Sequence, residues 1–102
     1  MSANFKVLVH RNSENIHLKL EGDFDGDSAH EVIDMLKYYC TGSSRVFIHT
    51  ACIDRIDSFG RHVFLSHLNS IKQKLAFLVV TGEKAFELIP DVDSSDLCVT
   101  VH

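Results

Sequence analysis

Apolar and polar residues alternate in two short stretches near the start of the chain. Apolar side chains occupy every second position from 5 to 9 and again from 16 to 20. Alternation with a period of two predicts strands that bury one face. The polar segment 11–15 between them has the composition of a turn, so we expect an N-terminal hairpin.

Farther along the chain the apolar spacing changes to that of helices. Ser28-x-x-Glu31 is a capping box and predicts the start of a helix, whose apolar stripe continues to Cys40. A second helix is expected over 58–74, because apolar residues follow one another at intervals of four and three from Phe64 onward.

Continuous apolar runs indicate strands that are covered on both sides. Such runs occur at 46–48 and 76–80, a short helix at 83–89 follows, and alternation over 97–101 predicts a last strand. The resulting order ββαβαβαβ predicts an α/β fold: a mixed β-sheet with helices packed mainly on one face and the hairpin at its edge. Because the 102 residues contain no repeat or linker, we expect one domain over 1–102.

The composition argues against several classes of function. Ten basic and fourteen acidic residues give a net charge of −4, whereas nucleic-acid binding calls for a concentrated basic face. No apolar run reaches the roughly 18 residues of a membrane span, and the N-terminus lacks an apolar signal core. Cys40, Cys52 and Cys98 show no zinc or disulfide spacing and suit a reducing compartment. We therefore expect a cytoplasmic protein without membrane insertion.

The segment 45–60 carries the most informative chemistry in the chain. A buried strand leads through a short loop into Asp57-Ser58-Phe59-Gly60, where the second helix is expected to begin. Unpaired N–H groups at a helix start attract phosphate, and a serine at that point is readily exposed. Gly60 leaves room for the close approach of backbone or of a partner. A plain helix cap is the alternative interpretation of the same four residues.

Two motifs in this order resemble the STAS family, the sulfate transporter and anti-sigma factor antagonist domains. Asp57-Ser58-Phe59-Gly60 is similar to the family's Asp-Ser-x-Gly, and Leu20-Glu-Gly-Asp-Phe-Asp25 resembles its Gly-Glu-Leu-Asp. The resemblance covers nearly the whole chain and implies a STAS domain of the anti-sigma factor antagonist type. It implies that a serine kinase phosphorylates Ser58. It also implies that the surface for partner binding includes Asp23, Asp25, Asp57, Phe59, Gly60 and Arg61.

Three positions depart from the family pattern. His49 stands where the family has Asp or Asn at the end of the central strand, and Lys74-Leu75 replaces a glycine before the next strand. His49 therefore puts in doubt a polar group that is normally close to the phosphorylation loop. Arg61 replaces a leucine and introduces a guanidinium that can pair with a phosphate. We expect the partner to be particular to this lineage.

A calcium loop is a weaker interpretation of the acidic residues. Asp23, Asp25 and Asp27 have the spacing that begins such a loop, but Ser28 stands where the loop needs glycine. A solvated acidic loop over 21–27, close to the phosphorylation site, explains the same residues. We predict that no metal or other cofactor is bound.

The sequence also contains no recognisable catalytic motif. The seven histidines include no HExxH, and His10 and His17 are expected at the surface. A serine hydrolase needs a nucleophile elbow such as GxSxG and a base within reach. Ser58 is not in that setting, although His49 or His62 could lie nearby. We predict a protein that is not an enzyme.

The sequence thus predicts a partner-switching protein. When unphosphorylated it would bind a serine kinase that is also an anti-sigma factor, and so free the sigma factor. Phosphorylation of Ser58 would release it, and a phosphatase would reverse the modification. The alternative is an accessory STAS subunit of a membrane transporter of the ABC type, which would use the same surface as a fixed docking face. The intact Asp-Ser-x-Gly favours the switch, since transporter-type members need no phosphorylatable serine.

Overall fold

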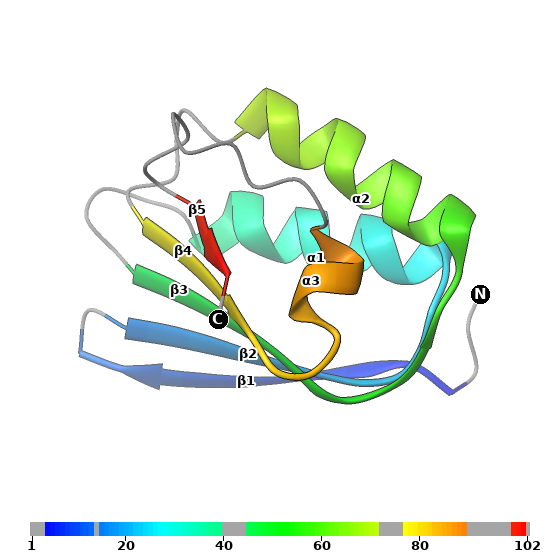
Figure 1. The fold of residues 1–102 in the computed structure, drawn as a ribbon. Helices are drawn as coiled ribbons and strands as arrows, with labels where there is room; N and C mark the ends of the chain where they lie inside the picture. The colour runs from blue at the N-terminus through cyan, green and yellow to red at the C-terminus, as the bar shows by residue number, and fades with distance from the viewer. Residues whose placement is uncertain (1–3, 14, 40–44, 72–76, 90–98, 102) are drawn as a thin grey trace.

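The computed structural model describes residues 4–13, 15–39, 45–71, 77–89 and 99–101. Cys40, Pro90, Cys98 and the expected part of the second helix after Ile71 lie outside these residues. The predicted order ββαβαβαβ is confirmed (Figure 1). The elements are β1 (Lys6–Asn12), β2 (Asn15–Phe24), α1 (Gly26–Tyr39), β3 (Arg45–Ile56), α2 (Ser58–Ile71), β4 (Phe77–Thr81), α3 (Ala85–Leu88) and β5 (Val99–Val101).

The strands form one mixed sheet in the order β1-β2-β3-β4-β5. The hairpin β1–β2 is antiparallel, and the other neighbours are parallel. Figure 1 shows the three helices on the same side of this sheet, with β1 at its edge. The predicted mixed sheet with helices on one face is confirmed, and the strand that contains 46–48 is central.

The core lies between the sheet and the helices. The alternating side chains of β2 and the apolar positions of β3 face α1 and α2, and Phe24 contacts Phe64 of α2 edge to face at 5.7 Å between ring centroids. Both rings are fully buried, so they fix the end of β2 against the middle of α2. The largest fully buried side chains are Phe24, Phe64, Leu18, Leu20, Ile33, Leu36, Ile48, Leu78 and Leu88.

The start of α1 differs from the prediction. Ser28 was expected to cap this helix, but the helix begins at Gly26 and the capping carboxylate belongs to Asp25, which accepts a hydrogen bond from the Ser28 N–H at 2.9 Å. Ser28 is instead a buried residue of the first turn and donates its own hydroxyl to Asp25 Oδ1 at 3.0 Å. The predicted capping box is therefore wrong, because the helix begins two residues before Ser28 and the Asp25 carboxylate caps it through the Ser28 N–H.

The strands are also longer than the sequence predicts. The expected acidic loop over 21–27 is strand as far as Phe24, and β3 continues to Ile56 across the loop expected before Asp57. The β2–β3 register shifts between Lys19 and Glu21 and again between Gly22 and Asp23. These irregularities let two bent strands stay paired until the point where both helices begin.

One face of the sheet is not packed against a helix of the described structure. Phe47 was expected to be covered like its neighbours, but it is only half-buried and lies on this open face, where its ring is stacked with that of His17. The open face is defined here by the outward side chains of β1 to β4, among them Leu8, His17, Phe47 and His49.

Candidate functional site

Ser58 is the first residue of α2 and is exposed, as the sequence predicts. The Asp57 N–H donates to the Phe24 carbonyl at 2.8 Å, which ties the end of β3 to the end of β2. The Asp57 carbonyl in turn accepts from the Arg61 N–H at 2.9 Å and so closes the first turn of the helix. Ser58 therefore stands where the N–H groups of its own helix lack backbone partners.

The start of α1 lies beside the start of α2. The Ser28 hydroxyl lies 3.0 Å from the Asp23 carbonyl as well as from Asp25 Oδ1, so these two acceptors share its one hydrogen. The Ala29 N–H donates to the Asp25 carbonyl at 2.9 Å. These bonds hold the segment from Asp23 to Asp25 in one conformation. The pKa of the Asp25 carboxyl is lowered, chiefly by the hydrogen bond from the Ser28 N–H, although burial opposes this effect.

Gly60 brings the two helix starts into contact. It is buried, and a Cβ at this position would lie 2.6 Å from the carbonyl carbon of Asp25 and 2.7 Å from its oxygen. Only a residue without a side chain fits at that distance. Gly60, one of the six residues expected in the partner surface, is therefore buried in backbone packing between the two helix starts.

An open hollow of about 560 Å³ lies at the junction. Four of the expected residues line it together, namely Asp23, Asp25, Asp57 and Ser58. Phe59 and Arg61 are not among its lining residues: Phe59 is 63 % exposed, with its ring lying on Gly26, and Arg61 is half-buried. We call this space the Ser58 hollow; its lining residues are Asn4, Asp23, Phe24, Asp25, Arg55, Ile56, Asp57 and Ser58.

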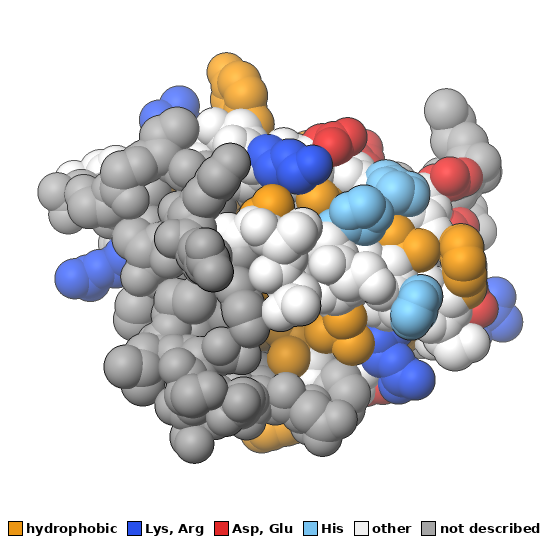
Figure 2. Space-filling view, turned by 90° about the horizontal axis from the view of Figure 1, so that it is seen from above, with side chains coloured by type: hydrophobic (Ala, Val, Ile, Leu, Met, Phe, Trp, Pro, Cys, Tyr) orange, Lys and Arg blue, Asp and Glu red, His pale blue; other side chains and the backbone are white. Residues whose placement is uncertain are grey.

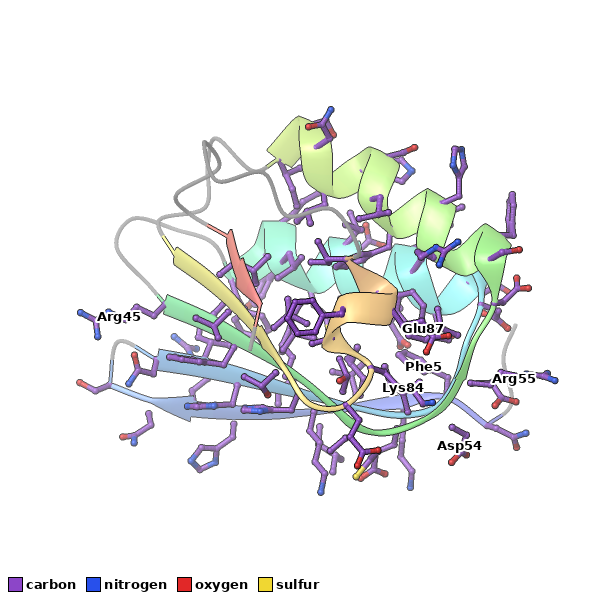
Figure 3. The ribbon with its side chains drawn as sticks, in the orientation of Figure 1. Phe5, Arg45, Asp54, Arg55, Lys84 and Glu87 are labelled. Atoms are coloured by element: carbon purple, nitrogen blue, oxygen red, sulfur yellow. The ribbon has the colours of Figure 1, made fainter. Side chains whose placement is uncertain are left out.

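Arg55 is the functional candidate that the sequence analysis missed. It lies on β3 opposite Asp23 and supplies the basic side chain among those that line the Ser58 hollow. Figure 3 shows it extending outward at the end of the sheet where β3 turns up toward α2. It is exposed, and no salt bridge to it is found among the described residues. The sequence contained one signal for Arg55, namely its position only three residues before Ser58.

The histidines are arranged differently from the prediction. His17 was expected to be an ordinary surface residue, but it is half-buried and hydrogen-bonded to His49. His49 also contacts Thr81, so its hydrogen bonds run across the open face and not to the phosphorylation loop. On the helical face, where Figure 2 shows histidines between apolar and charged side chains, the rings of His30 and His67 lie 5.1 Å apart.

Neither a metal site nor a membrane-spanning helix is found among the described residues. In that part of the chain, no three side chains of His, Cys, Asp or Glu are grouped closely enough to hold a metal ion. Asp25, one of the aspartates of the supposed calcium loop, caps α1 instead. None of the described helices has the length and apolar character that crossing a bilayer requires.

Comparison with solved structures identifies the fold. No family profile and no curated protein matches the sequence. The structure resembles unphosphorylated SpoIIAA, an anti-sigma factor antagonist, with a TM-score of 0.56 and 10% identity over 91% of this chain and 93% of that one. A candidate anti-sigma factor antagonist from Thermotoga maritima gives 0.60 and 18% identity, over 93% of this chain and 84% of that one. At these identities the likeness shows the fold, and the predicted STAS fold is confirmed.

The same fold occurs as a part of longer chains. Two crystal structures of a protein named Mglu match 72% of this chain, with TM-scores of 0.62 and 0.58 and identities of 28% and 22%. This chain spans only 18% of the Mglu chain in one structure and 22% in the other. The Mglu match therefore concerns one region of a larger protein.

Proposed function

We propose that the chain is a partner-switching protein of the anti-sigma factor antagonist type, with Ser58 as its phosphorylated residue and no catalytic activity of its own. The observation that carries the proposal is the position of Ser58: it is exposed at the first residue of α2, beside an acidic hollow. The fold, which this chain shares with SpoIIAA, supports the same function.

The geometry suits phosphorylation by another protein. A kinase must bring the terminal phosphorus of ATP to the serine oxygen, where an O–P bond forms, ADP leaves as its bond to that phosphorus breaks, and the hydroxyl proton passes to a base of the kinase. Ser58 is exposed, and no hydrogen bond from its hydroxyl to another described residue is found. The free N–H groups at the start of α2 would then favour the phosphate.

The added charge would act on a surface that is already acidic. A phosphate brings about −1.5 to −2 charges at neutral pH, next to Asp23, Asp25 and Asp57. In an interface from which water is removed, that charge must find a partner or be repelled. A loss of about 1.4 kcal/mol in binding is enough to lower affinity tenfold. The switch therefore needs no rearrangement of the fold.

Phe59 gives the same surface an apolar anchor. Its ring is 63 % exposed, although large aromatic side chains gain most from burial. Phe59 directly follows Ser58, so a partner that covers this ring also surrounds the serine. Exposed aromatic residues of this kind often dominate the binding energy of an interface. We propose that the unphosphorylated protein binds a serine kinase that is also an anti-sigma factor through this ring and the neighbouring aspartates.

The test compares three forms of the intact chain as ligands. Ser58→Ala and Ser58→Asp variants are used to capture partners from native cell extract, and a captured serine kinase is then titrated calorimetrically with wild type, both variants and phosphorylated protein. Binding by wild type and Ser58→Ala, weaker binding by Ser58→Asp and loss on phosphorylation support the switch. Equal affinity of all four forms, or capture of transporter subunits independent of position 58, would instead favour the accessory-subunit function.

A further inference from the structure

Three polar side chains form a continuous chain across the open face of the sheet. His17 Nδ1 on β2 lies 2.9 Å from His49 Nε2 on β3, and His49 Nδ1 lies 2.8 Å from Thr81 Oγ1 on β4. Thr50 donates to the Thr81 carbonyl at 2.7 Å, which fixes the far end of the chain. The function proposed for Ser58 uses none of these residues.

The two imidazole rings lie end to end. Their planes differ by 5° and their centroids are 5.2 Å apart. The two facing nitrogens are 2.9 Å apart, and the remaining centroid distance equals the radii of the two rings. The centroids and the two nitrogens therefore lie on one line. The N–H···N hydrogen bond is therefore nearly straight. Phe47 is stacked beside His17 at 4.7 Å and 10°, and this contact holds the His17 ring in the same orientation.

This geometry suits a proton better than a metal ion. An ion between the two nitrogens would need bonds of about 2.0 Å to each, and in a straight line these exceed the observed separation. A hydrogen bond between two imidazoles requires one nitrogen with a proton and one without. The neutral pair meets this condition whether His17 or His49 donates the hydrogen bond, because the Thr81 hydroxyl can either donate to His49 or accept from it.

Adding protons changes the pair in two unequal steps. With one extra proton, one of the two facing nitrogens is still bare, so the bond remains and becomes charge-assisted. With two extra protons, both facing nitrogens carry hydrogen and the rings repel each other. We propose that His17 and His49 bind a single proton as one site, and that a second proton breaks their link between β2 and β3.

The charged and titratable groups around the pair come from three strands. On β1, the His10 ring lies 6.3 Å from that of His17; on β2, Lys19 and Glu21 form an ion pair at 3.8 Å. On β3, Arg45 and Cys52 occupy the outward positions on either side of the pair. The described outward side chains of β4, Val79 and Thr81, carry no charge.

These surroundings act on His49. Burial, then the charges of His17 and Lys19, lower the pKa of His49, so the folded chain resists adding a proton to this ring. Because the folded pKa of His49 is lowered, the unfolded chain binds the second proton more readily. Stability is therefore complete above the unfolded value of about 6.5 and falls as the pH drops below it.

Nuclear magnetic resonance of the intact, isotope-labelled chain tests the proposal without any substitution. A nitrogen–nitrogen scalar coupling across the hydrogen bond should connect His17 and His49 at neutral pH, persist while the first proton is bound, and vanish with the second. His30 and His67 serve as controls in the same spectra. Absence of the coupling at every pH, or independent one-step titrations of His17 and His49, would overturn the proposal.

Two variants provide a second measurement. In His17→Leu the titration of His49 should become a single step and move to higher pH, because the charge of His17 no longer opposes it. Thr81→Val removes the hydroxyl at the other end of the chain and leaves the pair intact, so the coupling should remain. A His49 titration that does not respond to the His17 substitution, in a variant whose His30 and His67 signals are native, would also contradict a shared site.

Discussion

Gly60 lies directly against the backbone of Asp25, where a methyl group at position 60 would stand 2.6 Å from the Asp25 carbonyl carbon. The first turn of α2 and the loop that begins α1 therefore touch through backbone atoms. Neither backbone can give way without moving a helix. This contact sets the position of Ser58 relative to the acidic residues of the Ser58 hollow.

Replacing Gly60 with alanine should destabilise the domain by about 1–3 kcal/mol, because the added methyl group overlaps backbone that cannot move. Urea unfolding followed by circular dichroism measures the loss. Gly26→Ala is the matched control: its methyl group would meet only the exposed ring of Phe59, which can turn aside. In a helix position without such an overlap, alanine is more stable than glycine by about 0.5–1 kcal/mol. A Gly60→Ala variant that is more stable than wild type would therefore contradict the close contact between Gly60 and Asp25.

Asp25→Ala should cost about 0.5–2 kcal/mol, because α1 loses the carboxylate that accepts the Ser28 N–H. Asp25→Asn keeps an oxygen acceptor and should retain most of the stability at neutral pH. Thermal unfolding of the three proteins at pH 7 measures both effects. Equal stability of the alanine variant and wild type would show that another group caps this helix.

Acid unfolding separates the charge of Asp25 from its hydrogen bonds. Hydrogen bonding to Ser28 lowers the pKa of Asp25, so the unfolded chain takes up the proton first. The resulting stabilisation is complete above the unfolded value of about 3.9 and is lost as the pH falls through the folded pKa. Wild type should therefore lose more stability over that range than Asp25→Asn. Parallel pH profiles for the two proteins would exclude this contribution.

The parts of the fold that follow from local pattern are predictable from the sequence. The apolar run at 46–48 and the alternation in β2 each predict a strand, and both strands are confirmed, although Phe47 in the run is only half-buried. The cap of α1 is different, since Asp25 and Ser28 are both good capping residues. Which of them acts depends on how far β2 stays paired with β3, and that depends on tertiary structure.

Arg55 shows the same limit for the site. On β3 the buried positions are 46, 48 and 50 and then 53, so an irregularity changes which residues face the core. Alternation counted from Ile48 therefore cannot tell which way Arg55 points, whereas Ser58 is located by the start of a helix.

His17 and His49 are separated by 32 residues in the sequence, and only the parallel pairing of β2 and β3 brings them together.

The folded state should tolerate changes at Ser58. Ser58→Ala and Ser58→Asp should each alter the free energy of unfolding by less than about 1 kcal/mol, because the side chain is exposed and an acidic residue is favoured in the first turn of a helix. Chemical denaturation measures this, with Phe64→Ala as a core control expected to cost about 3–5 kcal/mol. A large loss in either Ser58 variant would mean that altered binding reports unfolding.

Arg55 should control the charge of a phosphate on Ser58. Its guanidinium lines the Ser58 hollow without a described salt bridge, whereas Asp23, Asp25 and Asp57 would raise the phosphate's second pKa from its ordinary value of about 6. A nearby cation favours the dianion, so in protein that carries phosphoserine at position 58, Arg55→Gln should raise that pKa by about half a unit to one unit. Phosphorus nuclear magnetic resonance measures the titration directly.

Arg61→Gln is the matched control, because Arg61 does not line the hollow and should change the titration less. An unchanged pKa in Arg55→Gln, or a larger shift in Arg61→Gln, would assign the phosphate to the Arg61 side of the helix. In that case the switch at Ser58 would remain open to test, but Arg55 would have no part in it.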